Sequence, residues 1–290
     1  MSRFTVRHET RYDYERPVRF GPQRLLVRPR DSHASRVWDA RLTLSPPGET
    51  RWVYDALGNS VCTFTPEGEA SRLSIVSELT VERFPAPLDV RVADPQTATP
   101  IVYAPPDRAV LAPFMSPVSE DLDGALLAWL RDHAGGVREP ALDFLLRLTH
   151  DISAEFAYEA RKEGEARPPC ETVRLKSGSC RDLAWLMVEA LRVLGYAARF
   201  VTGYLYSGGE AVRGAGATHA WCEAFLPSLG WIEFDPTNAL AESAALLPVA
   251  VSRTPAEAAP VSGKILGEPG ATRLTVHVDV RPAQSIPEAA

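Results

Sequence analysis

The 290-residue sequence has no long apolar run and no basic cluster, and each absence excludes a class of protein. The N-terminal segment MSRFTVRHETRYDYERP alternates charged and apolar residues, so it lacks the apolar core of a signal peptide. No later stretch is long and apolar enough to span a bilayer. The formal net charge is -6, with no basic run of the kind that follows a phosphate backbone. We therefore expect a cytoplasmic protein that binds neither membranes nor nucleic acid.

Cysteine is also scarce, and the few cysteines present lack the CxxC spacing of many zinc and redox sites. Without a secretion signal, reduced thiols are favoured over disulfides. The question is then whether any thiol is reactive. The four cysteines are Cys62, Cys170, Cys180 and Cys222.

Residues 1–105 have the pattern of an all-β region. Short runs rich in β-branched and aromatic residues, such as FTVRHETRYDY, RLLVRPR and RLSIVSELTVER, are separated by Pro, Gly and Asn at turn-like intervals. The Gly58-Asn59 pair in LGNSV predicts a hairpin turn. Strands spaced in this way predict an antiparallel sandwich or barrel. A proline-rich linker is expected at about residues 94–117.

From residue 106 to 245 the pattern predicts an α+β domain. DGALLAWLRDHA, EPALDFLLRLTHDISAEFAY and, most strongly, CRDLAWLMVEALRVLG carry apolar residues at helical spacing. Strand-like runs follow in AARFVTGYLY, HAWCEAFL and GWIEFD. The Gly-rich segment SGGEAVRGAGAT between the first two of these runs is a predicted mobile loop. Residues 246–290 are expected to form a C-terminal extension with one late strand, RLTVHVDVRP.

Cys180 lies where a Gly-containing turn meets the strongest predicted helix. Ser179 is the expected N-cap, which places Cys180 in the first helical turn. There the helix dipole favours a thiolate, and the exposed amides can hold the oxyanion that forms when a thiolate attacks a carbonyl. Asp182 is interpreted as favourable charge in that turn, or as the partner of Arg181 or a more distant base. A lone cysteine at a helix start is more often a small buried residue, so this position alone is weak evidence.

A histidine and an aspartate on consecutive predicted strands strengthen the case. His219 begins HAWCEAFL, where it can exchange a proton with Cys180. Asp235 closes GWIEFD, and the short LPSLG connection favours a hairpin that brings its carboxylate beside His219. The carboxylate would then fix the imidazole tautomer. Cys180, His219 and Asp235 together form the nucleophile, base and orienting group of a cysteine hydrolase.

The same three side chains and Cys222 are also potential metal ligands, but the pattern disfavours a metal site. His219 and Cys222 are three residues apart, so strand alternation points them to opposite faces. Structural zinc prefers close Cys pairs, and no EF-hand loop pattern is present. We expect no metal and no cofactor, and we interpret Cys62 and Cys170 as structural or incidental.

The motifs SGSCRDLAWLMVEALRVLGYAARFVTGYL and GATHAWCEAFLPSLGWIEFDPTN resemble the bacterial transglutaminase-like superfamily, whose members are often described as cysteine proteases. The resemblance covers residues 140–240 closely. The β-rich region with RLLVRPR and DALGNSV is similar to the accessory domain that precedes the catalytic core in these proteins. The resemblance implies a papain-like α+β core and a catalytic triad of Cys180, His219 and Asp235.

Two aromatic residues are candidates to bind substrate. Trp221 lies two residues beyond His219, so both side chains face one side of the strand, although packing in the core explains Trp221 equally well. Tyr204 is a candidate for the pocket wall, as is Tyr158.

The chemistry expected from these residues is acyl transfer on an amide, at a peptide bond or a glutamine side chain. Cys180 would form a thioester that water resolves, as in a protease, amidase or deamidase. Two alternatives stay open: a non-enzymatic scaffold with a transglutaminase fold, and a transglutaminase that accepts amines. The expected partner is a peptide or protein substrate, and the N-terminal β domain is a candidate surface for a protein partner.

Overall fold

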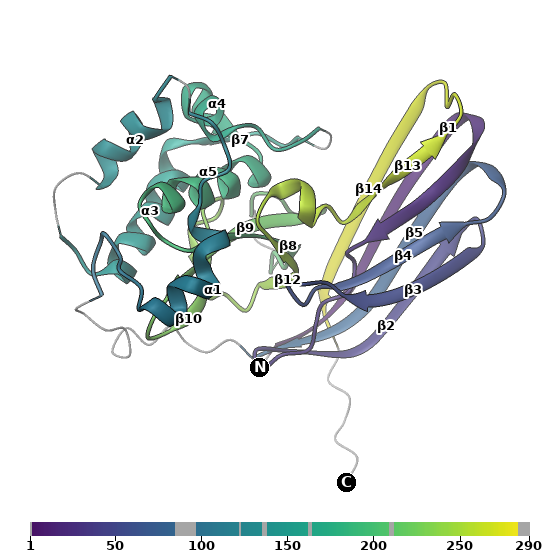
Figure 1. Ribbon diagram of the computed structural model, residues 1–290. Coiled ribbons are helices and arrows are strands. Elements are labelled where there is room, and N and C mark those ends of the chain that lie inside the picture. The colour runs from purple at the N-terminus through teal and green to yellow at the C-terminus, as the bar shows by residue number, and fades with distance from the viewer. Residues whose placement is uncertain are drawn as a thin grey trace, which may run out of the picture.

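The computed structural model describes residues 2–84, 97–121, 123–134, 138–161, 164–208 and 212–283. Two lobes stand side by side (Figure 1). Both ends of the chain build a β-rich lobe, and the middle of the chain builds a lobe of mixed helices and strands.

The β-rich lobe is an antiparallel sheet arranged around its longest strand. The first half of β1 pairs with β5 and β14, whereas its last residues pair with β4 and β13. The register with β5 shifts between Asp13 and Val18, so β1 passes from one group of strands to another. Apolar side chains between the two groups form the core of this lobe. The strands are β1 (Ser2–Leu25), β2 (Ser35–Ser45), β3 (Gly48–Tyr54), β4 (Ser60–Pro66), β5 (Glu69–Arg83), β13 (Val261–Leu266) and β14 (Thr272–Pro282).

The turn predicted at Gly58-Asn59 is confirmed as the connection between β3 and β4. The Gly58 amide donates to the Asp55 carbonyl at 2.9 Å, and the Asp55 amide donates to the Asn59 carbonyl at 3.1 Å. Gly58 has a φ of 77°, a left-handed conformation that glycine adopts without strain. The hairpin therefore forms because glycine occupies the position that requires this conformation.

In the described part of the mixed lobe, five α-helices pack around a five-stranded antiparallel sheet with the order β11-β10-β9-β8-β12. Helix α5 is the centre of this lobe, because all but two of its residues are buried and it packs against β8 and β9. The long elements are α1 (Pro105–Met115), α2 (Ala125–Ala134), α3 (Ala141–Glu155), α4 (Pro169–Leu175), α5 (Cys180–Val193), β8 (Ala198–Leu205), β9 (His219–Leu226), β10 (Gly230–Asp235) and β12 (Leu246–Ser252). The short ones are β6 (Ala157–Tyr158), β7 (Ser177–Gly178), β11 (Leu240–Ala241) and the 3-10 helix η1 (Pro255–Ala258).

Two regions differ from the sequence-based expectation. Part of the expected linker is helix α1. Its first turn contains prolines, which have no amide hydrogen, but amides in the first turn of a helix have no intrahelical partner, so the prolines are tolerated there. The C-terminal extension contains three strands, not one. Strand β12 joins the sheet of the mixed lobe, and β13 and β14 join the β-rich lobe. Pro248 and Gly263 interrupt the strand pattern of β12 and β13, which is why the periodicity did not reveal them.

The two lobes share an apolar cluster and a buried ion pair. Strands β1 and β5 contribute Phe4 and Val81 to this cluster, and β8 contributes Tyr204. Arg83 of β5 donates to the Glu233 carboxylate of β10 at 2.8 Å, with both side chains almost fully buried. The apolar contacts and the ion pair hold the β-rich lobe in a defined position beside the mixed lobe.

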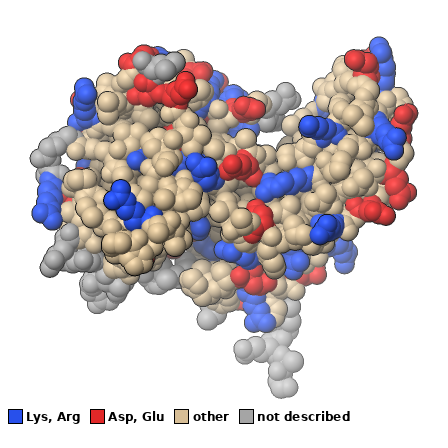
Figure 2. All heavy atoms as spheres, viewed as in Figure 1, with Lys and Arg blue, Asp and Glu red and all other residues tan. Residues whose placement is uncertain are grey.

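The surface carries charges of both signs. On the face shown in Figure 2, basic and acidic residues are interspersed over both lobes, and a notch separates the lobes at the top of the view. Among the described residues no helix is long and apolar enough to cross a membrane.

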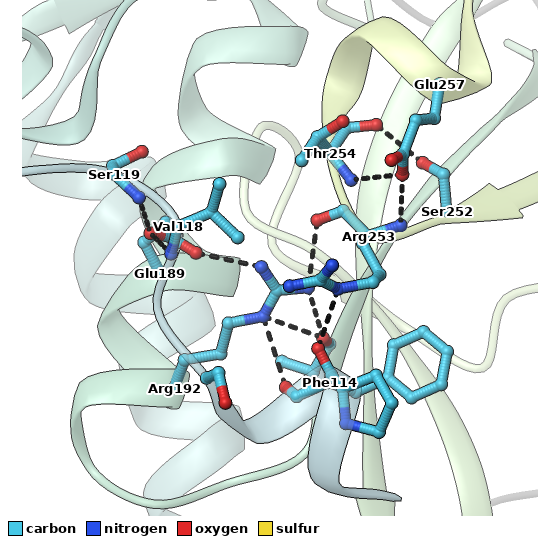
Figure 3. A network of polar contacts seen from close by, with 12 residues as sticks. Phe114, Val118, Ser119, Glu189, Arg192, Ser252, Arg253, Thr254 and Glu257 are labelled. Carbon is cyan, nitrogen blue, oxygen red and sulfur yellow. Dashed lines mark hydrogen bonds and ion pairs between the residues drawn. The ribbon is translucent and has the colours of Figure 1, made fainter.

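Helix α5 is anchored by a buried Arg192–Glu189 ion pair (Figure 3). The Glu189 carboxylate accepts hydrogen bonds from the Val118 and Ser119 amides, at 2.8 and 2.5 Å. Arg192 donates to the carbonyls of Phe114, Ala198 and Arg253 at 2.9–3.1 Å. One charge pair thus connects α5 to the segment after α1, to β8 and to the chain after β12, and it fixes the helix that begins at Cys180.

Replacement of Arg192 by Met should lower the free energy of unfolding by about 3–5 kcal/mol, because it leaves the Glu189 carboxylate buried without its countercharge. Urea denaturation of the variant measures this loss. Arg147→Met is the matched control, since Arg147 is exposed and its loss should change the stability by less than about 1 kcal/mol. Equal, small losses in both variants would show that the network does not anchor the helix.

Candidate active site

Cys180 begins helix α5, as predicted, and Ser179 is the N-cap residue. The buried Asp182 carboxylate accepts hydrogen bonds from the Ser179 amide and hydroxyl, both at 2.8 Å. Its other oxygen accepts from Arg161 Nη2 at 2.5 Å and from the Arg167 amide at 2.8 Å. Of the partners considered for Asp182, the structure shows the more distant base, Arg161. These bonds fix the turn that carries the Cys180 thiol.

The amides at the start of α5 point away from the helix. The first intrahelical bonds come from Asp182 and Leu183, which both donate to the Ser179 carbonyl at 3.0 Å. The amides of Cys180 and Arg181 precede these bonds and are left for a ligand or solvent. They lie at the positive end of the helix dipole, where a developing negative charge is stabilised.

His219 and Asp235 form a fully buried pair. His219 Nε2 lies 2.8 Å from Asp235 Oδ2, and both side chains are 0% exposed. Asp235 also accepts hydrogen bonds from the Thr237 amide and from Asn238 Nδ2, both at 2.9 Å. Burial raises the pKa of the Asp235 carboxyl, but the charge of His219 and these hydrogen bonds together outweigh burial and hold the pKa below its usual value. Asn238 was not singled out in the sequence, although its place three residues after Asp235 is within reach of the carboxylate.

The environment keeps His219 protonated at neutral pH. Burial lowers the pKa of His219, but the charge and hydrogen bond of Asp235, together with the adjacent Cys180 side chain, raise it to about 10. The Trp221 ring supports the imidazole from one side, with the two ring centroids 6.0 Å apart and the planes inclined by 29°. Because Asp235 occupies Nε2, Nδ1 is the ring nitrogen left for a further contact, and this buried atom forms no hydrogen bond with any described residue.

Gly214 and Tyr158 lie beside Nδ1 of His219. A Cβ atom added at Gly214 would lie 2.9 Å from Nδ1 and 3.5 Å from the Tyr158 hydroxyl oxygen, so both groups border one small space. Burial raises the pKa of Tyr158 to about 12, and the charge of Cys180 contributes to this shift. Gly214 was not recognisable from the sequence, because it is one of several glycines in a polar loop and only the folded loop places it against His219.

A cavity of about 630 Å³ opens beside Cys180. It is lined by Cys180, Arg181 and the loop around Gly214, and also by Leu274, Val276 and His277 from β14. A second cavity, of about 340 Å³, is lined largely by Ala and Pro side chains around η1 and also by His219. Arg181 and Thr218 line both cavities, so these two residues separate them.

Tyr204 and Trp221, the two residues considered for substrate binding, do not lie in the wall of the cavity beside Cys180. Both are buried, and neither lines the cavity beside Cys180. The Tyr204 hydroxyl lies 3.1 Å from Nδ1 of His8 in the cluster between the lobes. Trp221 lies in the apolar core behind His219. Strand alternation correctly placed Trp221 next to His219. His219 does not line the cavity beside Cys180 either, but it lines the second cavity.

Within the described ranges, one group of potential metal ligands lies close together, and it contains none of the three candidate catalytic residues. It consists of Asp121, Asp123 and Cys170. Asp123 forms an ion pair with Arg174, and Asp121 accepts hydrogen bonds from the first amides of α2. These carboxylates therefore already have protein partners.

Comparisons with known proteins identify relatives of both lobes. Residues 128–236 match the sequence profile of the transglutaminase-like superfamily, and residues 4–82 match that of the bacterial transglutaminase-like N-terminal region. The uncharacterized protein Rv2569c of Mycobacterium tuberculosis is 27% identical, covering 97% of this chain and 93% of its own length. The uncharacterized protein ML0607 of Mycobacterium leprae is 26% identical, covering 97% of this chain and 99% of its own length. The crystal structure of a "Putative Cysteine Protease" from Cytophaga hutchinsonii superposes with a TM-score of 0.72 at 21% identity, covering 98% of this chain and 92% of that one.

Replacement of Asp235 by Asn should lower the pKa of His219 from about 10 by about 1–3 units, because it removes the charge that stabilises the imidazolium. Because the folded-state value lies above the usual 6.5, this pair stabilises the fold fully below pH 6.5 and loses its effect as the pH rises through about 10. NMR titration of the imidazole resonances measures the shift. The buried His8, whose pKa burial lowers to about 4, is the internal control and should titrate unchanged. An unaltered His219 titration would contradict the assigned pairing.

Proposed function

Because residues 128–236 match the transglutaminase-like superfamily and the chain shares the fold of the Cytophaga hutchinsonii protein, we propose that it is a cysteine enzyme that transfers the acyl group of an amide. The buried hydrogen bond between His219 and Asp235, beside a thiol at a helix start, is the observation that carries this proposal. The unused helix amides next to the thiol lie where the oxyanion of such a reaction would form.

The reaction starts when the Cys180 thiolate attacks the amide carbon and the carbonyl oxygen becomes an oxyanion. Collapse of this intermediate breaks the carbon–nitrogen bond, and the leaving nitrogen takes the proton from Nδ1 of His219. A thioester on Cys180 and a neutral imidazole remain. His219 then accepts a proton from the attacking water, the carbon–sulfur bond breaks, and a carboxylic acid and the thiolate are released. Asp235 holds the imidazole and stabilises its charged form.

Tyr158 is the proposed side-chain donor to the oxyanion. Its hydroxyl shares a small space with His219 Nδ1, and both Tyr158 and Cys180 line the main cavity. No other described residue forms a hydrogen bond with this hydroxyl, so it is free to donate. Together with the Cys180 amide it would supply the two donors that an oxyanion site typically contains.

The second cavity favours an amine as an alternative acceptor. It is lined by His219 and by mainly apolar residues, including Phe200 and Ala256, which suit the aliphatic chain of a primary amine. An amine that reached the thioester along this path would displace Cys180 and form a new amide. Water remains our first proposal, because it needs no separate binding site.

The proposed function is tested by incubating the protein with glutamine-containing peptides, with and without a long-chain alkylamine, and analysing the products by mass spectrometry. We expect conversion of the carboxamide to the acid or cleavage of the peptide, and formation of the amine adduct if the second cavity admits the amine. Cys180→Ala should abolish all products. Cys170→Ala, which removes a partly exposed thiol outside the cavity, should leave them unchanged. Retained activity in Cys180→Ala would refute the proposal.

Replacement of Tyr158 by Phe should lower kcat by about 10²-fold with little change in KM, because a donor to the oxyanion acts mainly in the transition state. Steady-state kinetics with the substrate found above measures both constants. Tyr54→Phe is the matched control, since Tyr54 is 73% exposed on the β-rich lobe. A loss confined to KM would instead assign Tyr158 to substrate binding.

A further inference from the structure

Among the described residues, one edge of strand β14 pairs with no other strand, and part of this edge borders the cavity beside Cys180. One side of β14 pairs with β1 over its whole length. On the other side, the Val278 amide donates to the Gly216 carbonyl at 3.1 Å, so the backbone of Val278 faces away from β1. Because strand residues alternate, the amides and carbonyls of Leu274 and Val276 face the same way. Within the part of the chain that the structure describes, these outward groups have no backbone partner.

The cavity next to this edge has room for a second backbone. The wall facing β14 includes the run Gly214-Ala215-Gly216-Ala217, whose small side chains leave space. The bond between Gly216 and Val278 forms one rung of a ladder, and an extended chain in the cavity could continue the ladder at Val276 and Leu274. Such a chain would lie between β14 and the Cys180 thiol.

The charge of the cavity is positive. Its described lining contains Arg161, Arg181 and Arg213 but neither Asp nor Glu. Arg161 is paired with Asp182, whereas Arg181 donates only to the carbonyls of Gly164 and Arg161. The guanidinium of Arg213 donates only to the carbonyls of Ser153 and Thr237. Among the described residues, neither Arg181 nor Arg213 forms an ion pair. This contrasts with the net charge of -6 for the whole chain.

We propose that the substrate is an extended acidic peptide segment that adds as a strand to the outer edge of β14 at Val276 and Leu274. Backbone hydrogen bonds would hold the segment, and its carboxylates would neutralise Arg181 and Arg213. This inference rests on the proposed function, because it identifies the substrate of the same site. It also assigns a role to the β-rich lobe, which supplies one wall of the substrate site through a strand from the end of the chain.

Binding of fluorescent glutamine-containing peptides to the full-length Cys180→Ala protein tests strand addition without catalysis. The series contains an acidic peptide, a basic counterpart of equal length, and two acidic peptides methylated on alternate backbone nitrogens, in the two possible phases. We expect one of the two methylated peptides to bind about tenfold or more weakly than the unmethylated acidic peptide, since its methyl groups block hydrogen bonds to β14. The other methylated peptide should bind like the unmethylated one. The acidic peptide should bind more tightly than the basic one, by a margin that shrinks with added salt.

The protein side is tested by Val276→Pro, which removes an outward amide without removing a hydrogen bond to β1. We expect it to weaken binding of the acidic peptide by about tenfold, and Val276→Ala, which keeps the amide, to weaken it much less. Thr272→Pro is the matched control, because Thr272 has the same outward orientation but does not line the cavity. Arg181→Gln should reduce the preference for acidic over basic peptides.

The outcomes separate this inference from the proposed function. Equal binding of both methylated peptides, an effect of Thr272→Pro as large as that of Val276→Pro, a preference for the basic peptide, or no binding at all would overturn the inference. If the active protein converts peptides while these results are negative, the proposed function survives and the inference fails. If only one of the two methylated peptides binds weakly but the active protein converts none of the peptides, the inference stands and the proposed chemistry fails.

Discussion

The Asp235 carboxylate and the His219 imidazole share a hydrogen bond of 2.8 Å in a part of the protein that solvent does not reach. Burial of an unpaired carboxylate there would be strongly unfavourable. Asp235 is tolerated because Thr237 and Asn238 satisfy its remaining acceptor positions and because the imidazole carries the opposite charge. The acyl transfer that we propose at Cys180 would depend on this arrangement, since it holds the imidazole in place and favours its protonated form.

The rest of the fold keeps the thiol next to this pair. Asp182 fixes the turn before Cys180 through Ser179, and the Arg192–Glu189 pair fixes the other end of the same helix. The first is a set of buried hydrogen bonds and the second a buried ion pair, so α5 is held at both ends by polar contacts within the mixed lobe. The β-rich lobe adds the far wall of the cavity through β14, which pairs with β1 at the opposite end of the chain.

The sequence predicted the elements whose patterns are local. We could recognise the apolar stripe of α5, the strand patterns of β9 and β10 and the turn at Gly58, because helix, strand and turn each follow a short-range rule of residue spacing. The pairing of His219 with Asp235 and the place of Cys180 at the start of α5 followed from the positions of these residues at element ends. The proximity of Gly214 and Tyr158 to the imidazole could not be predicted, because it depends on how a loop returns to the sheet.

The pairing of strands that lie far apart in the chain could not be predicted from the sequence either. Nothing near RLTVHVDVRP indicates that this strand pairs with the N-terminus, or that its free edge borders the cavity at Cys180. Tyr204 is of a residue type that often lines pockets, yet it contacts His8 of the other lobe, because the lobes bury that face of β8. Only the packing of the lobes decides between these two environments.

The central claim is that Cys180 carries the acyl group during the reaction. Rapid acid quenching of the wild-type protein during turnover, followed by intact-mass analysis and peptide mapping, tests it most directly. The account predicts a transient adduct on Cys180 with the mass of the substrate acyl group, which hydroxylamine removes as it does other thioesters. Substrate conversion with no adduct, or with the adduct on another residue such as Cys170, would contradict it.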